Sequence, residues 1–593
     1  MYNPFQSHAA GVDLDRDRAD ASEIHSEAFG RCREMIVRVR QHRETQALLI
    51  LGEAGAGKTH LLGRLERWLE RSSEQGEASV FVPIRLASGG RMLWRLIRER
   101  LAQALLKRID DGRRLLQIVL PAPAAASEIP YDLGVVLKNL FEGVRVRESA
   151  AWLQGYDLPQ PALDLLALAP PRDDESLEAA SERVVINLCN LIAPVPVVFC
   201  LDQLESIQTH PGDSTGFPQF GSVISALHDG AAKNVAIISC LKTGLLVGFV
   251  EHVGQFAADR IAKRQVALHP LNFEQACRLA AARLDSVPEL RALRAQQAEP
   301  VWPLDRRALK AGFPKDGLLV ARAVIFRCFE LFERWQGHAA EPEISTDEFL
   351  HRTFEERIQA TPVEQSEAIL RNGLPALFRL RGLSYAPPEA ASILEGTLQT
   401  ERPTAIAISN HDARGTGLSR RLERLASEWP AATPALTVFR DARRGIGPGA
   451  RRTLERLKTL ENRGAKLINV KPEALAALNA LNQLLADARS EDLAMRGDPV
   501  PLATVEQWLA NHLSPSLEDL LEHIGQAPSS DFTAQLVDLV NKTKIIRLDE
   551  AAGTLQRPVE EVEALARSYP ALFGFAGGSA RVLFRAVPPV PSG

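Results

Sequence analysis

Residues 50–62 read ILGEAGAGKTHLL, and this stretch decides the fold. The segment from Gly52 to Thr59 matches the pattern G-x-x-x-x-G-K-[ST], which is typical of a loop that cradles phosphate groups. An apolar run at 47–51 (ALLIL) predicts a buried strand before the loop. The apolar spacing of 59–71 (THLLGRLERWLER) predicts an amphipathic helix after it. Strand, loop and helix in this order predict a nucleotide-phosphate site on an α/β fold.

The residue types of the loop suit that chemistry. Glycines adopt backbone angles closed to other residues, so that successive N–H groups can point at a phosphate. The helix N-terminus adds a favourable dipole. We expect Lys58 to reach the β- and γ-phosphates of ATP and the Thr59 hydroxyl to hold Mg²⁺. The residues expected to bind ATP are Gly52, Glu53, Ala54, Gly55, Ala56, Gly57, Lys58, Thr59 and His60.

A second strand-like run, PVVFCLD at 196–202, ends in an acid. A carboxylate at the C-terminal end of a parallel strand lies beside the phosphates, so Asp202 is predicted as the second Mg²⁺ ligand. Many P-loop ATPases place a glutamate directly after this aspartate to polarise the attacking water, but this chain has Gln203 there. Two interpretations remain. Either Glu205 polarises the attacking water from the next loop, or Glu205 is only a helix N-terminal acid and hydrolysis is slow.

Length and composition limit the number of domains and the class of protein. The 593 residues predict about three to five domains, and the net charge of −4 gives no overall field that attracts nucleic acid. The six scattered cysteines have no metal-ligand spacing and are expected to be reduced and buried. The N-terminus lacks signal-peptide order, and no apolar run is long enough to span a bilayer. We therefore expect a cytoplasmic protein without a membrane partner.

Beyond the loop, Asn3-Pro4-Phe5, the helical stretch 23–42, the run GKTHLL and the order of later strands resemble AAA+ ATPases. The similarity covers roughly residues 1–340. It points to the origin-recognition and DnaA-like initiator clade and to bacterial ATP-binding relatives associated with phage defence and mobile elements. The resemblance implies an AAA+ core at 1–271 with a helical insertion at about 90–190, a helical lid at 272–340, and ATP with Mg²⁺ as ligands.

Two polar positions of the core are implied by the same resemblance. In the strand VAIISCL at 235–241, Ser239 is similar to the sensor-1 residue that lies between the two Walker motifs, with Thr243 as the alternative. Arg260 is similar to the arginine finger that reaches the γ-phosphate in a neighbouring subunit, with Arg264 as the runner-up. A surface salt bridge is the competing interpretation for Arg260, and the finger implies a homo-oligomer.

The sensor-2 position in the lid is ambiguous. The pattern G-x-x-R falls on Lys315, which departs from the family because a lysine is a point charge and not a planar fork. Arg322 is the second candidate.

The C-terminal half predicts further domains. A helical connector is expected at 341–399, and strand–helix alternation at 400–490 predicts a small three-layer, Rossmann-like α/β module. A nuclease fold needs two acids and a lysine at strand ends, and no acid-x-lysine pair lies in a strand here. The module carries a dense basic face at 440–471, interpreted either as a DNA-binding surface or as a solvated face that pairs with a partner protein. Basic residues in the first half of the insertion (91–114) are interpreted either as an arm that contacts DNA phosphates or as a solvated helix face.

Residues 491–587 predict a helical and winged-helix-like domain, and 588–593 form a tail expected to be disordered. The helix predicted at 558–568 carries Glu560, Glu561 and Glu563. These acids would repel a DNA backbone, so protein docking competes with DNA reading there.

Three functions follow. The first is an AAA+ ATPase that acts on DNA, and the second is a nucleotide-gated signalling scaffold (STAND-like) with little turnover, which Gln203 favours. The third is a defence effector whose middle domain cuts nucleic acid, which the missing acid-x-lysine pair disfavours.

Overall fold

The structure is a computed structural model. It describes residues 2–5, 21–86, 92–109, 112–120, 129–156, 158, 160–169, 177–208, 216–228, 232–261, 263–314, 317–338, 344–361, 366–386, 393–399, 403–411, 417–429, 435–525, 536, 539–540, 542–555, 557, 559, 562–563, 566, 573–576 and 581–585.

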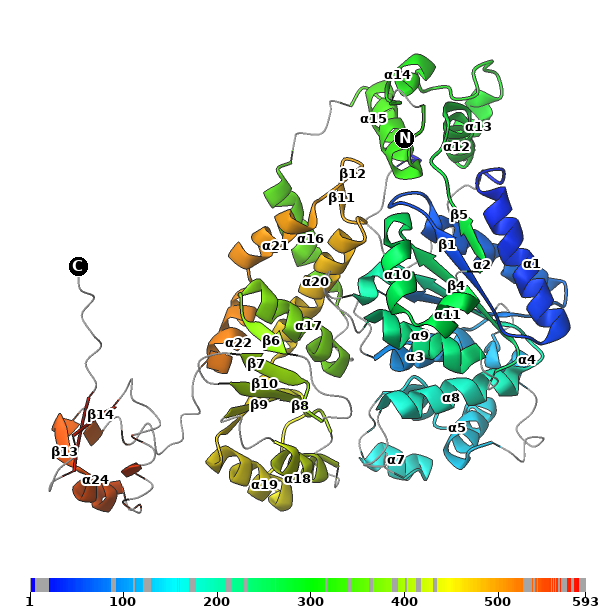
Figure 1. The fold of residues 1–593 in the computed structure, drawn as a ribbon. Coiled ribbons are helices and arrows are strands. Elements are labelled where there is room, and N and C mark those ends of the chain that lie inside the picture. Colours follow the sequence, from blue (N-terminus) through cyan, green and yellow to red (C-terminus); the bar gives the residue numbers. More distant parts are fainter. Residues whose placement is uncertain are drawn as a thin grey trace.

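The N-terminal body is built on a five-stranded parallel sheet of order β2-β3-β4-β1-β5 (Figure 1). The strands are β1 (Gln46–Leu51), β2 (Val80–Arg85), β3 (Val197–Asp202), β4 (Val235–Leu241) and β5 (Gln265–Ala267). The central strands β1, β3 and β4 are almost fully buried, which explains why their sequences are apolar throughout. The strands predicted at the P-loop, at Asp202 and at 235–241 are confirmed, and β4 lies between β1 and β3.

Helices cover both faces of this sheet. The helices α1 (Ser26–His42) and α2 (Lys58–Glu74) pack on one face with the side chains of Ile238 and Cys240. The helices α3 (Leu93–Leu106), α8 (Leu177–Ile192), α9 (Gly216–Ala226) and α11 (Gln255–Ile261) pack on the other face. Between β3 and β5 the chain also forms η3 (Leu204–Ile207), η5 (Thr243–Leu245) and α10 (Leu246–His252).

The insertion between β2 and β3 is helical, as predicted. Between α3 and α8 it contains α4 (Leu116–Val119), α5 (Tyr131–Glu142), α6 (Val146–Leu153) and α7 (Gln160–Leu166). Two of its basic side chains hold the insertion together: the Arg98 guanidinium is buried and donates to the Leu153 carbonyl at 3.1 Å, and Arg114 donates to the Leu140 carbonyl at 3.2 Å. The buried Arg98 is therefore not available as a DNA contact, Arg114 is half-buried, and Arg91 lies outside the described residues.

The region expected as a lid, called the lid below, consists of α12 (Phe273–Asp285), α13 (Pro288–Arg294), α14 (Arg306–Ala311) and α15 (Ala321–Trp335). The N-terminal Asn-Pro-Phe stretch packs on it. Phe5 is 1% exposed and meets the Phe332 ring edge-on, with 6.2 Å between centroids, while the Asn3 side chain donates to Glu333 at 2.6 Å. The start of the chain is thus anchored to the lid.

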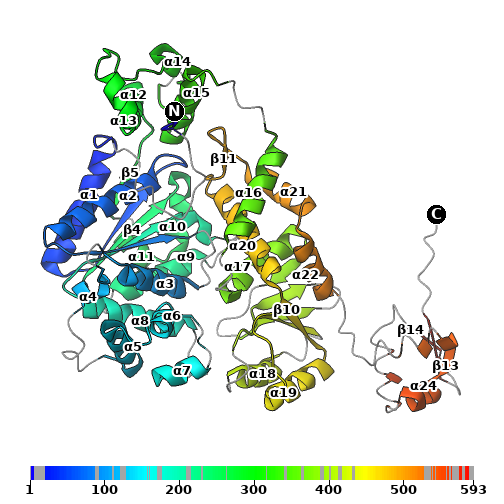
Figure 2. The same ribbon diagram turned by 180° about the vertical axis from the view of Figure 1, so that it is seen from behind.

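The second α/β unit is a three-layer fold around a five-stranded sheet of order β10-β9-β8-β7-β6. The predicted strands are present as β8 (Thr404–Ile408), β9 (Ala435–Asp441) and β10 (Ala465–Val470), and they run parallel. The helices α18 (Gly417–Glu428) and α19 (Arg451–Asn462) cover one face. The helices α16 (Thr346–Ala360), α17 (Ser366–Leu380) and α20 (Pro472–Arg489) pack in the core on the other face (Figure 2).

The region expected as a helical connector contributes to this unit. It supplies α16 and α17 and two antiparallel strands, β6 (Ser384–Ala386) and β7 (Gly396–Gln399). Strands of three and four residues are too short for an alternating pattern to predict them. After α20, the hairpin β11 (Ala494–Met495) and β12 (Asp498–Pro499) leads into α21 (Leu502–Asn511) and α22 (Pro515–Gly525). These two helices share the core of α20.

The C-terminal unit has its own small core and a three-stranded antiparallel sheet of order β13-β15-β14. It contains β13 (Ile545–Arg547), α24 (Leu548–Leu555), β14 (Phe573–Ala576) and β15 (Val582–Arg585). The turn expected as a wing, together with Glu560 and Glu561, lies outside the described residues, so the winged-helix assignment stays a prediction. Glu563 forms an ion pair with Arg581 at 2.6 Å.

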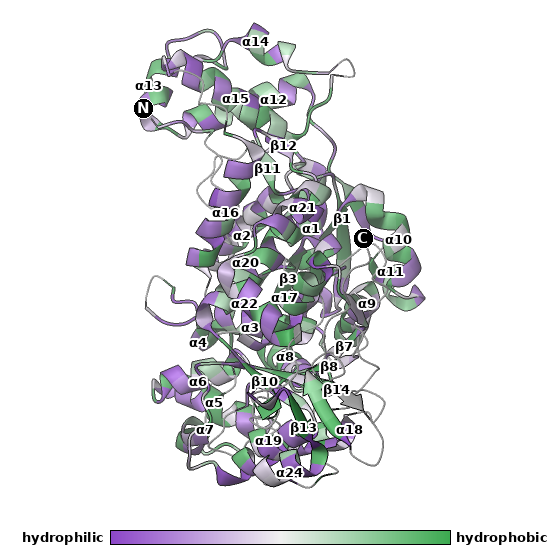
Figure 3. Cartoon of the chain, turned by 90° about the vertical axis from the view of Figure 1, so that its left-hand side faces the viewer, coloured by the Kyte–Doolittle hydropathy of each residue, from purple (hydrophilic) through white to green (hydrophobic). Residues whose placement is uncertain are grey.

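Hydropathy follows this layering. In Figure 3 the strand β3 is largely hydrophobic, while the helix α16 alternates hydrophilic and hydrophobic residues. Within the described ranges, no helix has both the length and the apolar character needed to cross a membrane.

Candidate nucleotide site

The loop between β1 and α2 has the backbone shape that phosphate binding needs. Gly55 (φ 75°) and Gly57 (φ 104°) lie in the left-handed region, which residues with a side chain disfavour. Gly57 caps α2, so the loop delivers the free N–H groups of a long helix to one point. Lys58 lies over the loop, where its ammonium donates to the carbonyls of Gly52 at 2.7 Å and Glu53 at 3.1 Å.

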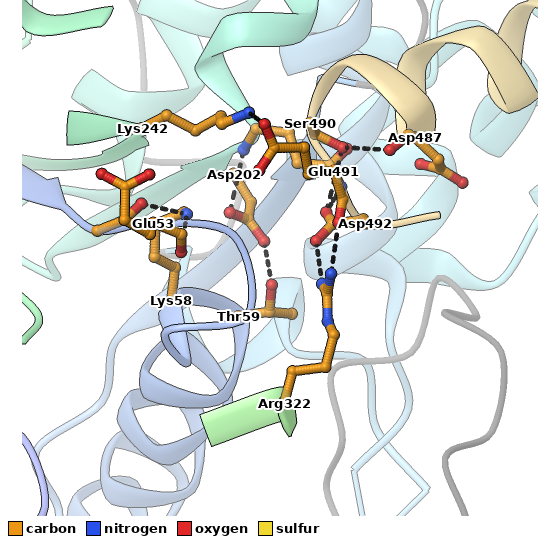
Figure 4. A network of polar contacts seen from close by, with 12 residues as sticks. Glu53, Lys58, Thr59, Asp202, Lys242, Arg322, Asp487, Ser490, Glu491 and Asp492 are labelled. Carbon is orange, nitrogen blue, oxygen red and sulfur yellow. Dashed lines mark hydrogen bonds and ion pairs between the residues drawn. The ribbon is translucent and has the colours of Figure 1, made fainter. Parts of the chain in front are cut away.

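The hydroxyl of Thr59 and the carboxylate of Asp202 meet at the end of the sheet. Thr59 Oγ1 donates to Asp202 Oδ2 at 2.6 Å, although 143 residues separate them (Figure 4). A hydroxyl beside a carboxylate at the phosphate loop is an oxygen pair of the kind that Mg²⁺ prefers, so these residues fit that ion. Burial raises the pKa of Asp202, and nearby Asp492 raises it further against the opposing effects of Thr59 and Lys58.

Gln203 and Glu205 take different positions after that aspartate. Gln203 is 3% exposed with a left-handed backbone (φ 60°), and its amide is engaged: Oε1 accepts from Arg85 at 3.0 Å and Nε2 donates to Asp492. Glu205 is 5% exposed in η3, and its Oε2 atom has no hydrogen-bond partner among the described residues. Burial raises the pKa of Glu205 to about 7, against the attraction of Lys58. Of the two, Glu205 has the free acceptor that a base requires.

Ser239 lies in the strand predicted for it, opposite Leu49 of β1 and Leu201 of β3. Its neighbours Ile238 and Cys240 pack on the α2 side, so by alternation Ser239 points to the other face. Thr243 is exposed in η5. The polar side chain that reaches the site from this strand is Lys242, which sequence analysis missed.

The lid contacts the phosphate loop through Arg322. The Arg322 N–H at the start of α15 donates to the Gly55 carbonyl at 3.1 Å, and a Cβ added at Gly55 would lie 2.7 Å from the Arg322 Cβ. The alternative, Lys315, lies outside the described residues. A second unpredicted neighbour is His25, whose Nε2 lies 3.0 Å from the Ala56 carbonyl oxygen. Burial lowers the pKa of His25.

Arg260 lies away from the phosphate loop of its own chain. It ends α11 and lines a cavity of about 740 Å³ at the opposite, N-terminal end of β1. The cavity is rich in cations, including Arg43, Lys233 and Lys263. Arg264, the alternative finger, also lines it and donates to the Gln46 side chain. A residue at this end can reach a nucleotide only in another subunit, so both finger assignments stay predictions.

The largest departure from expectation is an acidic segment of the second α/β unit beside the nucleotide site. The C-terminal end of α20 and the residues after it, 487–492, contain Asp487, Glu491 and Asp492 (Figure 4). Asp487 pairs with Arg85 at 2.8 Å, Glu491 with Lys242 at 2.7 Å, and Asp492 with Arg322 at 2.5 Å. The sequence DARSED at 487–492, where an apolar helix ends, contains all three acids, but nothing in the sequence indicates which residues they contact.

The basic face predicted at 440–471 is smaller than the sequence suggested. Arg440 is 1% exposed and donates to the Ser409 carbonyl at 2.6 Å, which excludes it from any surface. Arg463 donates to the Trp429 carbonyl at 2.8 Å, and Arg456 pairs with Glu423 at 2.7 Å. Arg443 is exposed but pairs with Asp441 at 2.7 Å. The other exposed cations in this range are Arg451, Arg452 and Lys458 on α19, Arg463 at its end, and Lys471 just before α20.

The chain is similar to several solved structures, although it matches no protein family. No protein-family model and no curated protein matches the chain. Among solved structures, the chain is similar to the ORC2 protein of Aeropyrum pernix (12% identity, TM-score 0.32), with 78% of this chain and 89% of that chain covered. It is also similar to Cdc6p of Pyrobaculum aerophilum (13%, TM-score 0.31; 64% and 78% covered) and to the ORC1 protein of Aeropyrum pernix in complex with DNA (16%, TM-score 0.28; 63% and 77% covered).

These are structures of the kind that the sequence resemblance named. At identities of 12–16% and TM-scores near 0.3, the similarity assigns neither a family nor a residue role to this chain.

Proposed function

We propose that this chain is an ATP-binding AAA+ protein that associates with DNA and couples its nucleotide state to the arrangement of its appended domains. The observation that carries the proposal is the contact between Thr59 and Asp202 beside the Lys58 ammonium, at the C-terminal ends of β1 and β3. This arrangement provides the N-terminal N–H groups of a helix, the Lys58 ammonium and an oxygen pair at a single point.

Different residues of the site bind the phosphates, hold Mg²⁺ and accept the proton of the attacking water. Lys58 and the loop N–H groups bind the β- and γ-phosphates, and Thr59 and Asp202 hold Mg²⁺, which screens the phosphate charge. Glu205 accepts the proton of the attacking water at its free Oε2 atom, because a base with a pKa of about 7 is half deprotonated at neutral pH. Arg322 is the proposed lid contact. The sensor role of Ser239 stays a prediction from the sequence resemblance, because Ser239 points to the face away from α2 and Lys242 is the side chain that reaches the site after β4.

The DNA-associated part of the proposal rests on the exposed cations of α19. Arg451 and Arg452 open this helix next to the glycine-rich turn 445–449, where a backbone phosphate can approach. A setting in phage defence or mobile-element biology is implied only by the sequence resemblance.

One observation favours the alternative of a nucleotide-gated scaffold. Gln203 stands where many ATPases have a glutamate, and both ends of its amide are engaged by Arg85 and Asp492. In this alternative ATP binding sets an assembly state and turnover is incidental.

The test is binding of MgATP to the full chain by calorimetry. Lys58→Ala should weaken binding about 100-fold, since hydrogen bonds to charged groups contribute roughly 1.5–3 kcal/mol each. Lys138→Ala, on the exposed face of α5, is the matched control and should bind as the wild type does. Equal affinities of wild type and Lys58→Ala would refute the proposal.

ATP turnover with and without duplex DNA separates the two candidates. Stimulation by DNA that Lys58→Ala abolishes supports the ATPase, whereas tight binding without turnover supports the scaffold. For the oligomer, mixing Lys58→Ala with Arg260→Ala subunits should restore activity if Arg260 acts on a neighbour's nucleotide.

A further inference from the structure

Three cations surround the C-terminal end of the central sheet, and each comes from a different element. Arg85 ends β2, Lys242 follows β4, and Arg322 lies in the first turn of the lid helix α15. All three lie at the edge where Lys58, Thr59 and Asp202 meet. Positive charges at this edge are what the triphosphate of a nucleotide would attract.

Each of these cations is neutralised by the acidic segment 487–492. Lys242 binds the Glu491 carboxylate at 2.7 Å, and its ammonium also donates to the Arg489 carbonyl at 3.3 Å. Arg322 donates to Asp492 Oδ1 at 2.5 Å and to the backbone carbonyl of Glu491. An arginine fork held by a carboxylate and a carbonyl makes the same paired contacts that it makes with phosphate oxygens.

The segment is shaped for this contact. The N–H groups of Asp492 and Leu493 both donate to the Asp487 carbonyl, at 2.8 and 3.0 Å, which turns the chain sharply after α20. Glu491 has a left-handed backbone (φ 58°), which residues other than glycine disfavour. A strained backbone that delivers two carboxylates to two cations indicates a specific contact.

The charge of the segment acts on the reacting groups. Asp492 Oδ2 accepts a hydrogen bond from the side-chain amide of Gln203, the residue directly after Asp202, so the negative charge of Asp492 lies close to Asp202. An ATP phosphate brought to the same place would be repelled by that charge. The segment and the nucleotide therefore compete for the same positive charges.

We propose that Glu491 and Asp492 are a built-in competitor for the nucleotide phosphates. The docked segment holds the second α/β unit against the AAA+ core, and MgATP displaces it by taking over Lys242 and Arg322. This inference rests on the proposed ATP site and names its regulation. By linkage, the factor by which docking weakens ATP binding equals the factor by which ATP weakens docking.

The first measurement is MgATP affinity of the full chain. Glu491→Gln with Asp492→Asn should lower the Kd about tenfold, within the range of roughly 5–150-fold typical of couplings between sites. Glu473→Gln, an exposed acid in the first turn of the same helix, is the matched control and should leave the Kd unchanged.

The second measurement is the distance between the two units. Spin labels on cysteines that replace Arg38 in α1 and Arg452 in α19 report it, because the six native cysteines are all buried. MgATP should broaden and lengthen the distance distribution in the wild type. In the double variant the distribution should already be broad without nucleotide.

The outcomes separate the two proposals. Wild type that binds MgATP through Lys58, with the same Kd in the double variant and no change in distance, overturns the competitor and leaves the ATP site standing. Loss of turnover in Asp492→Asn at unchanged affinity also overturns it, since Asp492 would then serve the reaction. Failure of wild type and Lys58→Ala to differ overturns both.

Discussion

The Arg85 guanidinium lies 2.8 Å from the carboxylate of Asp487, although 402 residues separate them in the chain. Asp487 is shared, because its second oxygen accepts from Arg357 of α16 at 2.7 Å. Burial alone would lower the pKa of Arg85, but Asp487, Asp492 and Asp202 together raise it. One acid thus links the edge strand of the central sheet to the helices of the second α/β unit.

Removing that acid should loosen the two units. Asp487→Ala removes the carboxylate that Arg85 and Arg357 share, and breaking a buried ion pair costs about 3–5 kcal/mol. The side chains of Arg85 and Arg357 are 23% and 19% exposed, so water reduces the expected loss to about 2–3 kcal/mol. Hydrogen exchange should increase at β2 and at the end of α20, and the urea midpoint should fall. Asp498→Ala, at an exposed position in β12, is the control; equal effects of both variants would contradict the linking role.

A substitution at Gly55 should disturb both the phosphate loop and its contact with the lid. Gly55→Ala puts a Cβ at 2.7 Å from the Arg322 Cβ and forces alanine into a left-handed backbone. The variant should be destabilised by about 1–3 kcal/mol and should bind MgATP more weakly. Gly30→Ala in α1 meets nothing within 4 Å and should instead stabilise the helix by about 0.5–1 kcal/mol. Thermal unfolding that moves in the same direction in both variants would argue against the contact.

Glu205 should give the stability of the core a pH dependence with a definite sign. Its folded pKa of about 7 lies above the ordinary value of 4.5, so the protonated form is favoured by folding. The resulting stability is fully present below pH 4.5 and is lost as the pH rises through about 7. One pKa unit is worth about 1.4 kcal/mol, so the loss is on the order of 3 kcal/mol.

Urea titrations between pH 4.5 and 8 check this dependence. Glu205→Gln should flatten the fall in stability and should abolish turnover while MgATP still binds. A variant with the wild-type pH slope would show that the buried carboxyl is not responsible.

The sequence was sufficient to predict those parts of the fold and the site that depend on a local residue pattern. The loop at 52–59 and the strand ending in Asp202 were both predicted, because parallel buried strands are apolar and their polar ends are conspicuous. Arg322 was predicted only as an alternative, since the lid helix has no pattern that fixes its contact with Gly55.

Contacts between distant segments could not be predicted. The acids at 487–492 reach the site only because α20 docks its C-terminal end there, and charge complementarity with Arg85 and Lys242 has no periodicity in the sequence. The density of arginines at 440–471 led us to predict a larger basic face than the structure has. Arg440 is buried against carbonyl groups that lie close to it only in the folded chain.

The exposed cations of α19 should carry whatever affinity the chain has for DNA. Reversing Arg451 and Arg452 to glutamate removes two phosphate contacts, so the slope of log K against log salt should become shallower by about 1.8, at roughly 0.9 per phosphate. Affinity for duplex DNA should fall similarly for unrelated sequences, because phosphate contacts carry no base information. The control reverses two exposed arginines elsewhere, Arg38 of α1 and Arg307 of α14, and matches the change in net charge. If both double variants bind DNA with the same affinity and salt slope, then only net charge matters, and the proposed DNA surface on α19 is excluded.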